Sequence, residues 1–273
     1  MIQTEVKLPK ISCLLVTARD RFEFFTRSVR CYADQTYPNR ELVVVNEGPK
    51  DYQQKLAAHL ADRSDVRFIF LDGKYSLGSL RNISIALCHG DLFVQWDDDD
   101  FNAPERLAVQ YHYLKSHPEA RICYFSEQLH YYFTTKRLFW ENWSAFHSGD
   151  RKEYSLIPGT IMAYKEGFDG RYPPAGPHCS AGEDSIMSYG VLSRNPDSVL
   201  LMADRGYMQV YSFHGKNVWD VEHHMKISRE RSMPTSFLLK NRERITQTLD
   251  YLQLDGPIKV TGREGLAFIY GGA

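Results

Sequence analysis

The stretch LFVQWDDDD, residues 92–100, passes directly from an apolar segment into four consecutive aspartates. Its apolar part is typical of a strand that is buried on both faces of a sheet. Carboxylates this close repel one another, so a folded protein must compensate their charge. A divalent cation does this, because carboxylate oxygens are hard ligands for Mg²⁺ and Mn²⁺. The alternative is a solvated acidic turn in which Asp100 lies near the N-terminus of the next helix.

Upstream of this stretch the chain alternates between short apolar runs and amphipathic segments. The pattern predicts strands at 11–17, 41–45, 66–71 and 92–96, and helices at 22–35, 51–62 and 77–89. This alternation predicts an α/β fold with a parallel sheet and helices on both faces. Ligands bind beyond the carboxyl ends of the strands in such sheets. The aspartates therefore fall where a binding site is expected.

Downstream of residue 100 the pattern is more mixed. It predicts helices at 102–116, 183–192 and 236–252, with strands within 121–133 and at 156–164, 199–202 and 207–213. Residues 168–181 are rich in proline and glycine and are expected to form a loop. We predict one large domain over 1–225 and a C-terminal helical appendage with a tail over 226–273.

The composition of the 273-residue chain is that of a globular protein, with 43% hydrophobic and 25% charged residues. Its 33 basic residues balance 34 acidic ones, which argues against a nucleic-acid partner, because such binding needs clustered cations. The five cysteines are scattered and include no CxxC pair, which favours a reducing cytoplasm over a disulfide framework. We expect no signal peptide and no transmembrane helix, which leaves peripheral contact with a membrane open.

A second acidic site occurs in GEDSIM, residues 182–187, where Glu183 and Asp184 follow the loop and open a predicted helix. Acidic residues favour helix N-termini because of the helix dipole, so the pair needs no further role. A carboxylate at a ligand-binding edge can also take a proton from a weakly nucleophilic hydroxyl group. The residues alone leave both interpretations open.

Five motifs, in this order and spacing, give the chain a resemblance to a known family. They are VTARDR at 16–21, VVVNEGP at 43–49, LGSLRN at 77–82, QWDDDDFNAPERL at 95–107 and GEDSIM at 182–187. Over about residues 10–220 the chain resembles the family 2 glycosyltransferases of the GT-A fold. The resemblance implies an α/β fold with a Rossmann-like, mostly parallel sheet. The resemblance implies an inverting enzyme that transfers a hexose or N-acetylhexosamine from a nucleotide-diphosphate sugar, with Mn²⁺ or Mg²⁺. The acceptor would be a hydroxyl group of a glycan, a lipid-linked molecule or another compound, in glycan or polysaccharide synthesis.

The resemblance also implies a nucleotide-binding half at about 10–100 and an acceptor half at about 101–225. It assigns six side chains to the nucleotide: Thr17, Arg19, Glu47, Arg81, Asp97 and Asp98. The family's pair of acids before a glycine reads Asn46-Glu47-Gly48 here, and Glu47 would accept a hydrogen bond from uracil, which implies a UDP-sugar. The residues alone leave a structural role open for three of these side chains. Thr17 would then cap a helix, Glu47 would be a turn residue, and Arg81 would be a surface ion-pair partner.

The resemblance assigns the metal and the chemistry to three further residues. Asp99 is the last acid of the DxD motif and would ligate the metal. His214, at the end of a predicted strand, would be a second ligand, since an imidazole suits Mn²⁺, although a lone histidine is often structural. Asp184 matches the catalytic base of the family. One base suffices when a metal offsets the charge of the departing diphosphate.

Several aromatic and polar residues are candidates for further contacts. Trp140 and Trp143 would either stack on a sugar ring or pack in the core or under a lid. Lys216, Asn217 and Trp219 follow His214 closely and would form a flap over the diphosphate.

Two other functions remain open. A sugar nucleotidyltransferase also combines such a sheet with clustered acids, but it normally has a glycine-rich, basic loop after the first strand, and ARDRFEFF at 18–25 contains no glycine. A non-catalytic relative that binds sugar or protein is the second alternative. The presence of both Asp99 and Asp184 argues against it, because a binding module needs only one of the two sites.

Overall fold

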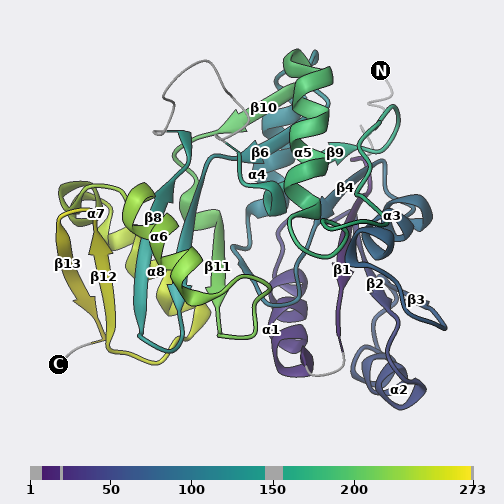
Figure 1. The fold of residues 1–273 in the computed structure, drawn as a ribbon, viewed down its shortest axis with the longest axis horizontal. Coiled ribbons are helices and arrows are strands. Elements are labelled where there is room, and N and C mark those ends of the chain that lie inside the picture. Colours follow the sequence, from purple (N-terminus) through teal and green to yellow (C-terminus); the bar gives the residue numbers. More distant parts are fainter. Residues whose placement is uncertain (1–7, 19–20, 145–155, 272–273) are drawn as a thin grey trace, which may run out of the picture.

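A seven-stranded sheet carries the residues around the four aspartates (Figure 1). The computed structural model describes residues 8–18, 21–144 and 156–271. The strand order is β10-β6-β9-β4-β1-β2-β3. The strands are β1 (Ile11–Val16), β2 (Arg40–Asn46), β3 (Val66–Phe70), β4 (Leu92–Gln95), β6 (Ile122–Phe125), β9 (Met162–Tyr164) and β10 (Val199–Met202). Only β9 runs antiparallel to its neighbours β4 and β6. The predicted mostly parallel sheet is confirmed.

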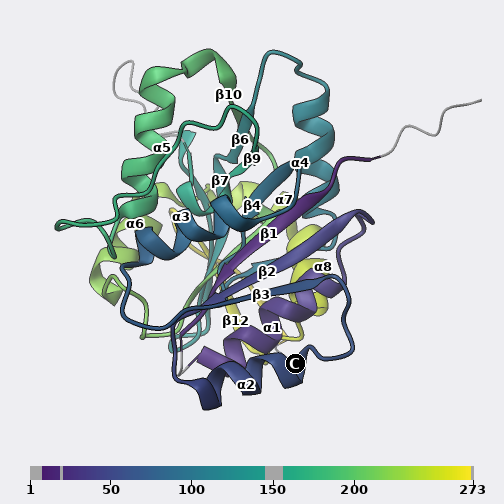
Figure 2. The same cartoon turned by 90° about the vertical axis from the view of Figure 1, so that its right-hand side faces the viewer.

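Helices cover both faces of this sheet, because successive residues of each strand point to opposite sides. The helices are α1 (Phe22–Ala33), α2 (Lys50–His59), α3 (Leu77–Leu87), α4 (Arg106–Lys115) and α5 (Glu183–Arg194). Cys13 and Leu15 of β1 share a core cluster with residues of α1, α2 and α4, whereas Leu14 shares another with residues of α3 and α5. Figure 2 shows the two groups of helices on opposite sides of the strands.

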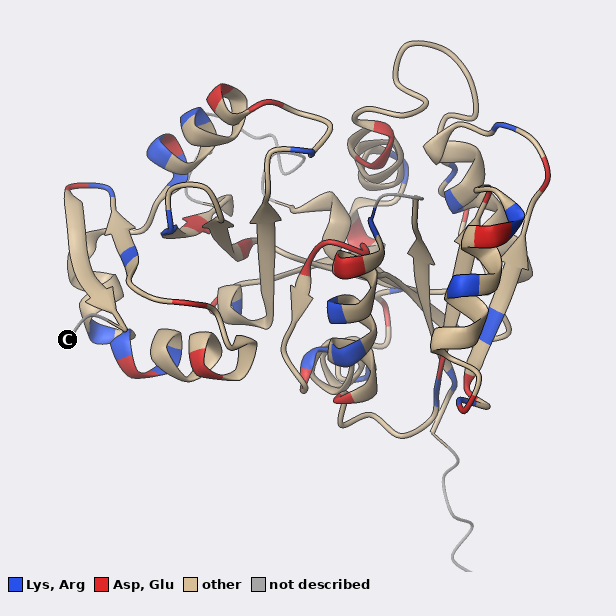
Figure 3. Cartoon of the chain, turned by 90° about the horizontal axis from the view of Figure 1, so that it is seen from below, with Lys and Arg blue, Asp and Glu red and all other residues tan. Residues whose placement is uncertain are grey.

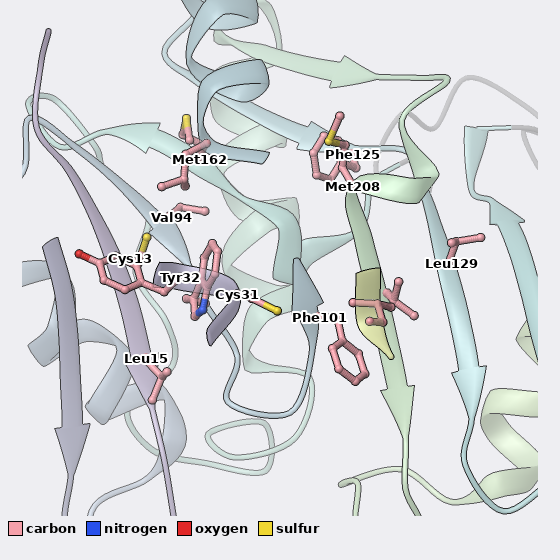
Figure 4. Close-up of a cluster of buried hydrophobic side chains, with 14 of the residues drawn as sticks. Cys13, Leu15, Cys31, Tyr32, Val94, Phe101, Phe125, Leu129, Met162 and Met208 are labelled. Carbon is pink, nitrogen blue, oxygen red and sulfur yellow. The ribbon is translucent and has the colours of Figure 1, made fainter. Parts of the chain in front are cut away.

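A second sheet of six strands extends the fold in the order β13-β12-β8-β7-β11-β5. Its strands are β5 (Phe101–Asn102), β7 (Glu127–Tyr132), β8 (Arg137–Asn142), β11 (Gln209–Phe213), β12 (Ile258–Gly262) and β13 (Gly265–Tyr270). One apolar cluster runs from Cys13 and Val94 of the first sheet to Phe101 and Leu129 of the second (Figure 4). The two sheets therefore share a hydrophobic core.

The C-terminal segment differs in part from its prediction. The helix predicted at 236–252 is interrupted at Asn241 and forms α7 (Thr235–Lys240) and α8 (Arg242–Leu252). The unpredicted strands β12 and β13 form a hairpin that pairs with β8 of the second sheet. A further unpredicted helix, α6 (Val221–Arg231), contains the predicted boundary at residue 225. The segment after 225 thus adds strands as well as helices.

Basic and acidic residues are interspersed along the helices (Figure 3). This distribution agrees with the balanced composition. In the part of the chain that the structure describes, no helix has both the length and the apolar character needed to cross a membrane.

A buried polar network holds the second sheet against α6. Glu141 on β8 is fully buried and accepts hydrogen bonds from His130 Nδ1 on β7 at 2.8 Å and from Ser228 Oγ on α6 at 2.6 Å. Burial alone would raise the pKa of Glu141, but the charge and hydrogen bond of His130 lower it to about 2. This stabilisation is present above the ordinary pKa of a glutamate and is lost as the pH falls toward 2.

Replacing Glu141 with glutamine is expected to lower the free energy of unfolding by about 3–5 kcal/mol at neutral pH, because His130 loses its buried partner. Thermal unfolding should then shift down by about 10 °C. The exposed Glu119 on the segment after α4 offers a matched control, and Glu119→Gln should leave the midpoint within about 2 °C. An unchanged midpoint for Glu141→Gln would show that the ion pair adds no stability.

Candidate active site

The four aspartates lie where the chain leaves β4, at the carboxyl edge of the first sheet. No two of the four carboxylates have the same full set of partners. Asp97 accepts from Arg81 Nη2 at 3.0 Å and Gln95 Nε2 at 2.9 Å. Asp100 is buried and accepts from the backbone N–H of Ser212 and from Gln209 Nε2, both at 3.0 Å. Asp100 therefore joins the end of β4 to β11, which agrees with a supporting role.

Asp98 and Asp99 share the guanidinium group of Arg21. Arg21 Nη1 lies 2.8 Å from Asp98 Oδ1 and 2.9 Å from Asp99 Oδ2. Asp99 Oδ2 also lies 3.0 Å from His214 Nε2, and the His214 ring stacks on Phe24 at 4.2 Å between ring centroids. The two residues predicted as metal ligands are thus in direct contact, although 115 positions separate them.

The two neighbouring acids have opposite electrostatic environments. Burial and the negative charge of Asp99 raise the pKa of Asp98 to about 7, although Arg21 opposes the shift. Burial also acts to raise the pKa of Asp99, but the hydrogen bond from His214 and the charge of Arg21 hold it below the ordinary value. Asp99 is therefore the acid that stays ionised at neutral pH and can hold a cation.

Arg81 connects the aspartates to the second acidic motif. Its guanidinium group lies 3.0 Å from Asp97 Oδ1 and 3.1 Å from Glu183 Oε1, and its side chain is only 11% exposed. This burial excludes the surface ion pair considered from the sequence. Arg81 therefore joins α3, the end of β4 and the start of α5.

Asp184 lies in the first turn of α5, after Gly182 with a φ of 76°. Its Oδ1 accepts from the backbone N–H of Ser185 at 2.7 Å. Burial raises the pKa of Asp184, while the charge of Arg81 opposes the shift. Glu183 is engaged by Arg81, so Asp184 is the less committed carboxylate of the pair.

The remaining predicted nucleotide residues lie after β1 and β2. Thr17 is buried, and its carbonyl oxygen accepts from Asn46 Nδ2 at 2.8 Å. The helix that follows begins after Arg21, so Thr17 does not cap it. Glu47 accepts a hydrogen bond from the backbone N–H of Tyr75. Arg19 lies outside the described residues.

Sequence reasoning missed Arg21, the residue that bridges Asp98 and Asp99. The motif VTARDR contains two arginines, Arg19 and Arg21, and the folded chain shows that Arg21 contacts the aspartates, whereas Arg19 lies outside the described residues. For Trp140, the structure agrees with the core packing that the sequence left open beside stacking on a sugar ring. Trp140 is 1% exposed and donates to Glu127 at 2.9 Å, so it packs in the core and does not stack on a ligand.

These acids, arginines and His214 converge at the carboxyl edge of a mostly parallel sheet, in the order of motifs found in the sequence. The model of the family described as "Glycosyl transferase family 2" matches residues 13–165, more than half of the chain. The chain belongs to glycosyl transferase family 2. The family prediction is confirmed.

The matches to individual relatives extend over only part of each protein. A Haemophilus influenzae protein named "Uncharacterized glycosyltransferase" is 30% identical over 106 residues, which are 37% of this chain and 32% of that protein. The matched stretches cover 32% to 42% of the lengths of four curated relatives.

Solved structures confirm the predicted fold. S. aureus TarS in complex with UDP-GlcNAc superimposes with a TM-score of 0.57 at 12% identity, over 90% of this chain and 68% of that chain. The mannosyltransferase PcManGT from Pyrobaculum calidifontis, in complex with GDP-Man and Mn²⁺, gives a TM-score of 0.54 at 13% identity, over 92% and 66% of the two chains. At these identities the similarity is one of fold.

Proposed function

We propose that this protein is a metal-dependent, inverting glycosyltransferase that moves a sugar from a UDP-sugar to a hydroxyl group of an acceptor, in glycan or polysaccharide synthesis. The observation that carries the proposal is the joint arrangement of the Asp99–His214 pair and Asp184 around two partly buried arginines, Arg21 and Arg81. The family match favours glycosyl transfer over nucleotidyl transfer. The five free cysteines support a reducing, cytoplasmic setting.

The residues around Asp99 fit a divalent cation. Asp99 offers an ionised carboxylate and His214 an imidazole nitrogen, a combination that suits Mn²⁺. Among the described residues, no three His, Cys, Asp or Glu side chains form a metal cluster, so donor oxygens and water would complete the coordination. When bound, the cation would offset the charge of the leaving diphosphate. PcManGT, which shares the fold, is described as a complex with Mn²⁺.

The chain's own residues would then perform two tasks. Arg21 and Arg81 supply fixed guanidinium groups next to the aspartates, and such groups pair well with phosphate oxygens. Asp184 would accept the proton of the acceptor hydroxyl group as that oxygen attacks the sugar. A single displacement with one base inverts the anomeric centre, because the attacking oxygen enters opposite the leaving group.

A release assay for nucleoside diphosphate, run across UDP-, GDP-, CDP- and dTDP-sugars with and without EDTA, tests the proposal. We expect acceptor-stimulated release of UDP that stops in excess EDTA. Full activity in excess EDTA would disprove the metal dependence. The absence of release with any donor would favour the non-catalytic relative.

The base of the nucleotide is predicted separately. We expect calorimetric titration in Mn²⁺ to give tighter binding for UDP than for GDP, CDP or dTDP, because Glu47 follows β2 at the position that resembles the family's uracil contact. Glu47→Ala should weaken UDP binding by about tenfold, the usual worth of a hydrogen bond to a charged group. TarS and PcManGT were solved with different bases, so the fold alone does not select one. Tighter binding of GDP or dTDP would show that Asn46-Glu47 belongs to another base pocket.

A further inference from the structure

Trp219 is an exposed aromatic side chain next to the candidate active site. It is 46% exposed, whereas Trp96 and Trp140 are buried. Its ring stacks on His223 at 4.9 Å between centroids with 23° between the planes. Val218 and Val221 on either side are also exposed. Neighbouring exposed apolar side chains of this kind are found at interaction and ligand-binding surfaces.

The loop that carries Trp219 is connected to the acid cluster. The backbone N–H of His214 donates to Asn217 Oδ1 at 2.9 Å, and Asn217 Nδ2 donates to the carbonyl oxygen of Ser212 at the same distance. Arg21 Nη2 donates to the carbonyl oxygen of Lys216 at 3.5 Å. Trp219 is therefore held by the same segment that presents His214 to Asp99.

A groove begins where this loop enters α6. It has a volume of about 440 Å³ and is lined by one face of the helix: Val221, Glu222, Met225, Lys226, Arg229 and Glu230. This volume is within the usual range for small-ligand sites, about 300–1,000 Å³. Figures 1 and 2 show α6 on the same side of the molecule as α5, the helix that begins with Glu183 and Asp184.

The chemistry of the groove selects the occupant. Its two acidic and two basic side chains cancel in charge, which disfavours a polyanion. Four charged side chains also make it unsuited to an acyl chain, because burying them against hydrocarbon would be costly. They offer many donors and acceptors for hydroxyl groups, while Trp219 offers a flat apolar surface for the C–H face of a sugar ring.

We propose that Trp219 and the α6 groove bind the acceptor, and that the acceptor is an oligosaccharide whose sugar rings stack on Trp219 and extend along α6. This inference rests on the proposed glycosyltransferase function and adds the class of acceptor to it. Trp219 acts by holding the acceptor, so its role is distinct from that of the metal pair and of Asp184.

The proposal is tested by measuring the binding of a fixed panel of probes with saturation-transfer NMR and calorimetry. The probes are chitotetraose, maltotetraose, their monosaccharides and phosphatidylglycerol vesicles. We expect a tetrasaccharide to bind the wild-type protein more tightly than its monosaccharide, with no binding to the vesicles. Trp219→Ala should weaken this binding by about tenfold, whereas Trp219→Phe, which keeps an aromatic ring, should stay within about threefold.

Matched controls separate this surface from others. Leu266→Ala removes a similarly exposed apolar side chain on β13, and Lys259→Ala removes an exposed charge on β12, so both should leave oligosaccharide binding unchanged. Lys226→Ala, within the groove, should weaken it. Affinity for UDP in Mn²⁺ should stay within about twofold in Lys226→Ala, Leu266→Ala and Lys259→Ala, since none of these side chains contacts the acid cluster in the structure. A loss of UDP affinity in Trp219→Ala would instead support the flap over the diphosphate and count against the acceptor role.

Three results would overturn the inference. They are binding of vesicles in place of oligosaccharides, no binding of any tetrasaccharide to the wild-type protein, and equal binding to the wild-type and Trp219→Ala proteins. Failure of the proposed function is distinguishable from failure of this inference. It would show as absent UDP binding and absent nucleotide release, whether or not oligosaccharides bind.

Discussion

Replacing Asp184 with asparagine is expected to lower the rate of sugar transfer by about 10²–10⁴-fold, the usual contribution of a positioned general base. Asparagine keeps the size of the side chain and its acceptor for the Ser185 N–H, but it cannot take a proton. Affinity for UDP should change little, because the lost interaction is made mainly in the transition state. Nucleotide-release kinetics and calorimetry on the same preparations measure both effects.

A pH profile makes the assignment sharper. A general base works only when deprotonated, and burial raises the pKa of Asp184. The wild-type rate should therefore fall on acidification at a higher pH than an ordinary aspartate would give. Glu183→Gln is the neighbouring control, and it should act through Arg81 by weakening UDP binding. If Asp184→Asn transfers sugar at the normal rate, Asp184 is only a helix-terminal acid, and Glu183 becomes the candidate base.

Replacing Asp99 with alanine should show the opposite balance. We expect transfer to become undetectable and UDP affinity in Mn²⁺ to fall by about 10²-fold, because His214 and Arg21 lose the ionised carboxylate between them. Addition of Mn²⁺ should no longer tighten UDP binding in this variant. Calorimetric titration of UDP with and without Mn²⁺ measures the loss directly.

Asp100 provides a matched control next to Asp99. Burial raises its pKa well above the ordinary value, so an uncharged amide of the same size is a mild replacement for its carboxyl group. In Asp100→Asn, the amide of Gln209 can turn its unpartnered Oε1 toward the new N–H group. We therefore expect this variant to keep its Mn²⁺-dependent UDP binding. Equal losses in both variants would show that the whole acidic run is structural, and that Asp99 has no special role.

Much of the first sheet could be predicted from the sequence, because its strands are continuous apolar runs and its helices follow in regular alternation. Strand β1 was predicted to within one residue, and the predicted helix at 22–35 ends two residues early, at Ala33. The second sheet was harder. Strands β12 and β13 have only four buried residues among their eleven, so neither shows the continuous buried run that marks the strands of the first sheet. The pairing of β12 with β8, more than 100 residues away, exists only in the folded chain.

The sequence by itself determined that four acids follow a buried strand at the ligand-binding edge of an α/β sheet. That result is local, since it follows from the apolar run of β4 and the polarity change at Asp97. The tertiary structure decided which partners each acid meets. Arg81 reaches both Asp97 and Glu183, which is 102 positions away, and His214 meets Asp99 across 115 positions. The four aspartates are alike as residues, and they differ in role because the packing of distant elements gives each one its own partners and its own burial.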